Sequence, residues 1–259
     1  QIGDNHVIVP LEPVTLADHW VIRQINRAAQ QIEEHLQAYR FAEAADAVYH
    51  MVWNDLADWY IEASKTAINQ PILSWALATS LQLAHPFAPF VTETIWQTLN
   101  YTTGILMADR WPEPEKFDDI SAEQFERLKD LVSEGRWVIA ELPGNEKYRL
   151  LFGNDSLVES NQELIKHLMR LEGIEKIDQP RGLRLSAANR EVWLDIDSET
   201  LYQHQSNLEL RLASARKRQE TLSSRLSNQN YLDKAPQQLI DETKSELVET
   251  KKLIERLVN

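Results

Sequence analysis

A stretch of about a hundred residues without glycine constrains the fold of this chain most strongly. All seven glycines lie outside residues 4–103. Glycine is the commonest residue where the backbone needs a positive φ, so tight turns must be scarce in this stretch. Apolar residues at helical spacing fill it, and we expect a bundle of long helices over residues 1–119.

Capping and proline signals predict where these helices begin and end. Thr15, with Asp18 three residues later, predicts the start of a first helix that runs to about residue 38. A second helix is expected over residues 41–68. A third begins at Pro71 and is broken at Pro86, because proline removes a backbone donor and clashes with the preceding turn. A fourth helix follows through residues 95–99.

The sequence changes character after residue 119. Alternating apolar and polar residues favour strands, and one amphipathic segment favours a helix. We therefore expect a small α/β connector over residues 120–205. Its predicted helices are 122–131 and 156–171, and its predicted strands are 136–141, 148–152, 183–186 and 191–196.

Two helices with a narrow apolar seam are expected over residues 206–259. Apolar residues follow alternating steps of three and four from Leu208 to Leu226 and again from Ile240 to Leu257. Asn228 and Pro236 bound a short connector between them. The second helix should therefore fold back on the first as an antiparallel coiled coil, which makes the predicted fold class mainly α.

Composition excludes several classes of function. The net charge is −13, but residues 206–259 hold ten Lys and Arg against eight Asp and Glu, whereas residues 1–119 hold six against sixteen. An acidic protein is not suited to coating nucleic acids non-specifically, so we expect no DNA partner.

No cysteine is present, and no two histidines lie three to five residues apart, so no metal site is expected. The absence of a long apolar run or a signal-like N-terminus predicts a cytoplasmic protein without a membrane partner.

The candidate contacts in the bundle lie where its first two helices meet. Tyr39, Arg40 and Phe41 place two aromatic rings and a guanidinium at one corner, which suits stacking on unpaired RNA bases. Arg23 and Arg27 lie four residues apart on the first helix. The alternative is that Phe41 packs onto the bundle and the arginines pair with acids.

The candidate contacts in the arm are basic residues on its first helix and in its turn. An excess of cations on one coiled-coil helix favours a polyanion, although a protein partner for a generic coiled coil is as plausible. The residues are Arg211, Arg216, Lys217, Arg218, Arg225 and Lys234.

Three segments resemble the class I aminoacyl-tRNA synthetases for valine, isoleucine and leucine. These are residues 16–20, residues 49–65 and the His-Pro-Phe-x-Pro-Phe-x-x-Glu-x-x-Trp pattern of residues 85–96. Pro86 should kink a helix there, with Phe87, Phe90 and Trp96 sealing the core. The turn at 226–236 is similar to that of the C-terminal coiled coil of the valyl-tRNA synthetase family, whereas residues 201–205 depart from the usual entry into that coiled coil.

The resemblance implies a division of function. The bundle would bind the anticodon of tRNA(Val) and the arm would support the corner of the tRNA. The parent reaction would join valine to tRNA with ATP, but no signature of the catalytic domain occurs in these residues. We therefore expect a monomeric fragment, inactive alone and without a cofactor, since ATP would bind the missing catalytic domain. Because the chain begins at Gln1, we expect it to be cut from a longer protein. The alternatives are a free-standing tRNA-binding paralogue and a structural coiled-coil scaffold.

Overall fold

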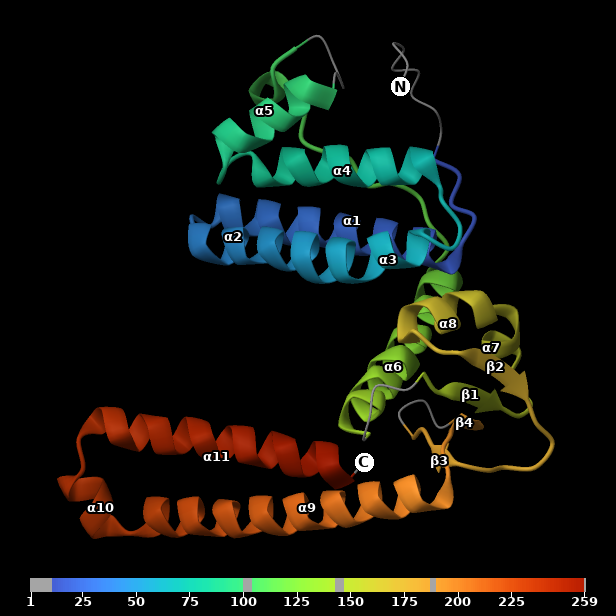
Figure 1. Cartoon of the computed structure of the whole chain (residues 1–259). Coiled ribbons are helices and arrows are strands. Elements are labelled where there is room, and N and C mark those ends of the chain that lie inside the picture. Colours follow the sequence, from blue (N-terminus) through green and yellow to red (C-terminus); the bar gives the residue numbers. More distant parts are fainter. Residues whose placement is uncertain (1–10, 100–103, 143–146, 187–189, 259) are drawn as a thin grey trace. The chain divides into compact units, whose positions relative to one another are not determined.

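The computed structural model describes residues 11–99, 104–142, 147–186 and 190–258. It divides into two compact units (Figure 1). Unit 1 comprises Gln1–Val132 and Ser156–Arg170, and unit 2 comprises Ser133–Asp155 and Leu171–Asn259. The fold is mainly α with a small mixed sheet, as the sequence predicts.

Unit 1 is a helical bundle. Helices α2, η1 and α3 follow one another without a break, and η1 has π-helical geometry. They form the second helix predicted from the sequence, which ends at Ser64 rather than near residue 68. The helical segments are α1 (Leu16–Gln37), α2 (Phe41–His50), η1 (Met51–Tyr60), α3 (Ile61–Ser64), α4 (Gln70–Ala84), α5 (Pro89–Leu99), the 3-10 turn η2 (Leu106–Ala108), the first part of α6 (Asp119–Glu141), α7 (Ser156–Ser160) and α8 (Gln162–Met169).

Helix α1 lies at the centre of the bundle core. Its apolar side packs among α2, η1 and α4, and Trp20, Ile25 and Ile32 are fully buried. The predicted capping box is present: Thr15 Oγ1 accepts a 3.1 Å hydrogen bond from the Asp18 amide, and Asp18 accepts one of 3.0 Å from the Thr15 amide. Because Asp18 is itself buried, this cap also fixes the start of α1 in the core.

The proline-rich segment after α4 behaves as predicted, except at one aromatic residue. Helix α4 ends at Ala84 and α5 begins at Pro89, so the chain breaks around Pro86. Trp96 is buried and Phe87 packs on the core, but Phe90 is 89% exposed. The expectation that Phe90 seals the core is wrong. Phe90 and Trp96 are six residues apart, whereas neighbouring side chains on one face of a helix are three or four residues apart.

Unit 2 contains a four-stranded sheet of order β2-β1-β4-β3. Strand β1 pairs in parallel with β2 and antiparallel with β4, which pairs antiparallel with β3. Gly182 has a φ of 80° before β3, and a Cβ there would lie 2.1 Å from the Leu194 carbonyl oxygen, so only glycine fits. The strands are β1 (Arg149–Phe152), β2 (Gly173–Lys176), β3 (Leu183–Arg184) and β4 (Val192–Asp195).

Three details of the predicted connector are corrected. Residues 136–141 are helical, because α6 runs through the buried Gly135 and its helical apolar period continues to Val138. The predicted helix 156–171 is divided into α7 and α8 at Asn161. Strand β2 was missed, since its sequence GIEK is short and has little buried surface.

The arm is a helical hairpin within unit 2. Helices α9 (Ser198–Ser227) and α11 (Gln237–Val258) lie side by side and antiparallel, joined through the short α10 (Gln229–Lys234) (Figure 1). The predicted seam is buried at Ala215, Leu222, Ile240, Thr243 and Thr250. Residues 201–205, which depart from the family's usual entry into the arm, are an unbroken part of α9.

Candidate nucleic-acid interface

The corner between α1 and α2 presents two exposed aromatic rings. Tyr39 is 81% exposed and Phe41 is 56% exposed. The rings lie edge to face, with centroids 6.2 Å apart and planes at 84°. The amide of Arg40 donates a 2.8 Å hydrogen bond to the His35 carbonyl oxygen, which closes the turn below them. A flat ligand such as an unpaired base can therefore stack here without rearrangement of the corner.

Tyr39 adopts a backbone conformation that costs stability. Its φ is 58°, in the left-handed region that glycine occupies freely and bulky residues avoid. The cost is about 1–2 kcal/mol. An exposed side chain recovers little of this through burial. A tyrosine at this position is therefore better explained by what its ring contacts outside the chain than by folding.

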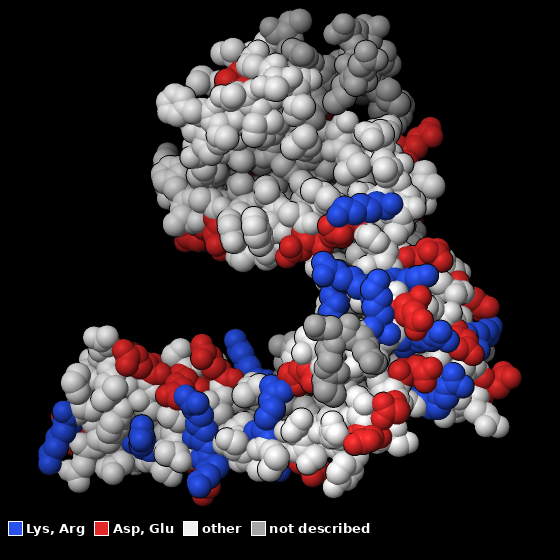
Figure 2. Space-filling view, viewed as in Figure 1, with Lys and Arg blue, Asp and Glu red and all other residues white. Residues whose placement is uncertain are grey.

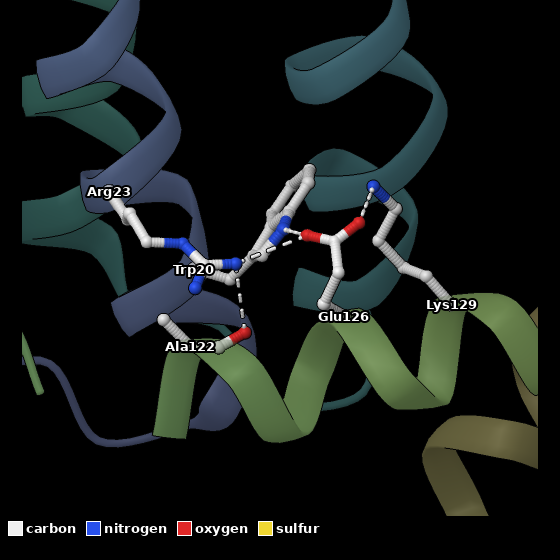
Figure 3. Close-up of polar contacts among 5 residues, drawn as sticks. All are labelled: Trp20, Arg23, Ala122, Glu126 and Lys129. Atoms are coloured by element: carbon white, nitrogen blue, oxygen red, sulfur yellow. Dashed lines mark hydrogen bonds and ion pairs between the residues drawn. The ribbon is translucent and has the colours of Figure 1, made fainter. Parts of the chain in front are cut away.

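Of the five contact residues predicted in the bundle, four have exposed side chains: Arg27, Tyr39, Arg40 and Phe41. Arg23 is the exception, because its side chain is buried and faces helix α6 (Figure 3). Its Nη2 atom donates to the Ala122 carbonyl oxygen at 3.3 Å and to Glu126 Oε2 at 3.2 Å. A guanidinium held in this way cannot reach RNA, so the alternative that Arg23 pairs with an acid is correct.

Glu126 gathers donors from three side chains (Figure 3). Trp20 Nε1 lies 2.5 Å from its carboxylate and Lys129 Nζ lies 3.0 Å away, in addition to Arg23. Lys129 also lies 4.3 Å from the centroid of the Trp20 ring. Burial opposes ionisation, but the hydrogen bonds from Lys129 and Trp20 and the nearby cations lower the pKa of Glu126. This network joins α1 to α6 inside unit 1.

A second exposed aromatic pair lies farther along the second helix. Tyr49 and Trp53 are 57% and 56% exposed, and their planes are within 5° of parallel at a centroid distance of 6.3 Å. The sequence analysis did not select them as site residues. The signal that would have found them is an aromatic pair at i and i+4 outside the apolar stripe of the helix.

The arm cations are exposed, but two of them are already paired. Arg218 forms an ion pair with Glu246 across the hairpin, and Arg211 pairs with Glu141 at 2.5 Å. Hydrogen bonding to Glu141 raises the pKa of Arg211, and burial lowers the pKa of the adjacent His204. Figure 2 shows basic side chains on the visible face of the arm. Within the part of the chain that the structure describes, no acid pairs with Arg216, Lys217, Arg225 or Lys234.

Two further classes of site receive no support from the described residues. Among them, no group of three His, Asp or Glu side chains is arranged to hold a metal ion. None of the described helices has the length and apolar character needed to cross a bilayer.

Two family models match the chain. The anticodon-binding domain of tRNA ligase matches residues 18–144, and the valyl-tRNA synthetase tRNA-binding arm matches residues 200–259. The first model covers unit 1 helices that carry the aromatic corner, and the second begins two residues after the start of α9. The two matches together define the chain as the tRNA-recognition region of an aminoacyl-tRNA synthetase.

Similar proteins narrow the class further. The chain is 29% identical to the valine–tRNA ligase of Thermotoga maritima, over 98% of this chain and 31% of that protein. It is 30% identical to that of Petrotoga mobilis (95% of this chain, 31% of that protein) and 31% identical to that of Fervidobacterium nodosum (92% and 29%). The chain belongs to the valyl-tRNA synthetase family. It spans about a third of the length of these relatives.

Proposed function

We propose that this chain recognises tRNA(Val) through two separate contacts. The exposed rings and guanidinium groups of Arg27, Tyr39, Arg40 and Phe41 bind the unpaired bases of the anticodon. Four cations of the arm, Arg216, Lys217, Arg225 and Lys234, bind the phosphates of the tRNA corner. Base contacts specify a nucleic acid, whereas phosphate contacts position it. The observation that carries the proposal is the left-handed, 81% exposed Tyr39 beside Phe41, within the segment that matches an anticodon-binding domain.

The arm contact is proposed to depend on Arg216, Lys217, Arg225 and Lys234. Arg211 and Arg218 are excluded from the proposed contact, because Glu141 and Glu246 already neutralise them. An arm that binds phosphates contributes equally to all tRNAs and its contribution falls with salt. This explains how a chain of net charge −13 can bind a polyanion through a local basic surface.

Titration of fluorescently labelled tRNA against the chain tests the proposal. Replacing Arg216 and Lys217 with alanine should weaken binding of all tRNAs and reduce the salt slope. Replacing Lys251 and Lys252 removes the same charge from the other arm helix and is the matched control. Phe41→Ala should instead reduce the preference for the valine anticodon. If both kinds of variant weakened the binding of all tRNAs equally, the proposal that the bundle specifies the anticodon while the arm binds any tRNA would be refuted.

The parent activity is proposed to be ATP-dependent joining of valine to tRNA. This chain supplies recognition to that reaction, and we propose that it is a cytoplasmic monomer that does not aminoacylate tRNA alone. An aminoacylation assay and light scattering after gel filtration test these statements.

The alternative of a free-standing tRNA-binding paralogue differs only in what the gene encodes upstream of this chain, so sequencing that region distinguishes it. The matched families disfavour the coiled-coil scaffold.

A further inference from the structure

Tyr49 and Trp53 form an exposed aromatic surface that the core does not require. Val48, Met51 and Leu56 of the same helix are buried and supply its packing against the core. The planes of the two rings are within 5° of parallel, and their centroids lie 6.3 Å apart. Two large rings that are held parallel and are more than half exposed can offer their faces to a flat ligand.

The polar groups around the two rings indicate what kind of ligand fits. Asp46 is exposed on the preceding turn and lies 3.4 Å from His50 Nε2, and Asn54 Nδ2 lies 2.9 Å from His50 Nδ1. Glu43 and Asp58 are also exposed on this helix. These acids repel phosphate. Carboxylate and amide oxygens beside an aromatic face can, however, accept hydrogen bonds from the amino groups of a stacked base.

The surface continues the proposed anticodon contact along the same helix. Phe41 begins α2, and Tyr49 lies eight residues later, or about 12 Å along the axis at 1.5 Å per residue. Three to four stacked nucleotides cover about the same distance at roughly 3.4 Å each. One unpaired RNA segment can therefore reach both aromatic pairs.

We propose that Tyr49 and Trp53 are a second base-stacking site, which binds another unpaired base of the RNA held at Tyr39 and Phe41. This inference rests on the proposed function. It adds two residues to the proposed RNA contact and predicts how their contribution to affinity responds to salt. Because the two rings are uncharged and contact a base rather than a phosphate, their own contribution to affinity is independent of salt, unlike that of the arm cations.

Binding of full-length tRNA by double variants tests the site. Tyr49→Ala with Trp53→Ala should weaken binding about 5- to 150-fold, without change in the salt slope. Tyr49→Phe with Trp53→Phe should retain most of the affinity, because the π-faces remain. Phe90→Ala is the matched control, since it removes an exposed aromatic ring from the same bundle. Circular dichroism melts verify that each variant is folded.

A tRNA that lacks one loop base completes the test. If that base stacks on Tyr49 and Trp53, removing the base and removing the rings should cost no more together than either does alone. Unchanged affinity of the alanine variant, with Phe41→Ala still weakening binding, would overturn the second site and leave the proposed function intact. Absence of any tRNA binding by the unmodified chain would overturn both.

Discussion

The Tyr60 hydroxyl donates a 2.8 Å hydrogen bond to Asp18 Oδ1 in the core of unit 1. Asp18 is the acid of the capping box at the start of α1, and Asn69 also donates to its other oxygen at 3.1 Å. One buried carboxylate therefore joins α1, η1 and the N-cap of α4. Each donor offsets part of the cost of burying the charge.

Tyr60→Phe should destabilise unit 1 by about 1.5–3 kcal/mol, because a hydrogen bond to a buried charged group is lost. Burial and the adjacent Asp18 raise the pKa of Tyr60 above its ordinary value of 10.0. The stabilisation is thus complete below pH 10 and is lost as the pH rises above it. Urea unfolding of both proteins at pH 8 and pH 10.5 measures this, and a difference that stays constant between the two would contradict it.

Glu126→Gln should destabilise the bundle by about 1–3 kcal/mol, since Arg23 and Lys129 lose their counter-charge in a partly buried site. The pKa of Glu126 is lowered in the folded state, so its contribution is present above the ordinary value of 4.5 and disappears as the pH falls. Denaturation at pH 7 and pH 4 should show the difference shrinking. Glu123→Gln, which breaks only an exposed pair with Arg127, is the control and should have little effect.

Local signals in the sequence predicted most of the bundle correctly. The capping pair Thr15 and Asp18 and the break at Pro86 depend on neighbouring residues alone, so they could be read directly. The predicted strand at residues 136–141 is instead part of α6, which continues through Gly135, because a glycine inside a helix costs only about 1 kcal/mol and tertiary packing can outweigh that.

The candidate sites were less predictable, because they depend on contacts between distant residues. Arg23 and Arg27 look alike in sequence, yet Glu126, about a hundred residues away, binds only the first. The same holds in the arm, where Glu246 neutralises Arg218 from the opposite helix. Exposure at Tyr39 and Phe41 was predictable because it follows from a turn between adjacent helices.

Tyr39→Gly should separate the folding and binding roles of this residue. Stability should rise by roughly 0.5–1 kcal/mol, because relief of the left-handed conformation exceeds the entropy cost of glycine. Anticodon preference should fall, since the ring is lost. Tyr39→Ala keeps the strained backbone without the ring and should lose preference without gaining stability. Thermal unfolding and competition between tRNAs measure the two effects, and a glycine variant less stable than the unmodified chain would refute the strain argument.

Glu246→Gln should strengthen tRNA binding, because it releases Arg218 from its ion pair for contact with phosphate. One additional phosphate contact should steepen the salt slope by about 0.7–0.9. Glu249→Gln is the matched control, since it removes an equal charge from an exposed position on the same helix. In the unmodified chain, Arg218→Ala should weaken binding less than Arg216→Ala. If the two glutamine variants strengthen binding equally, the overall charge of the arm matters and the pairing of Arg218 does not.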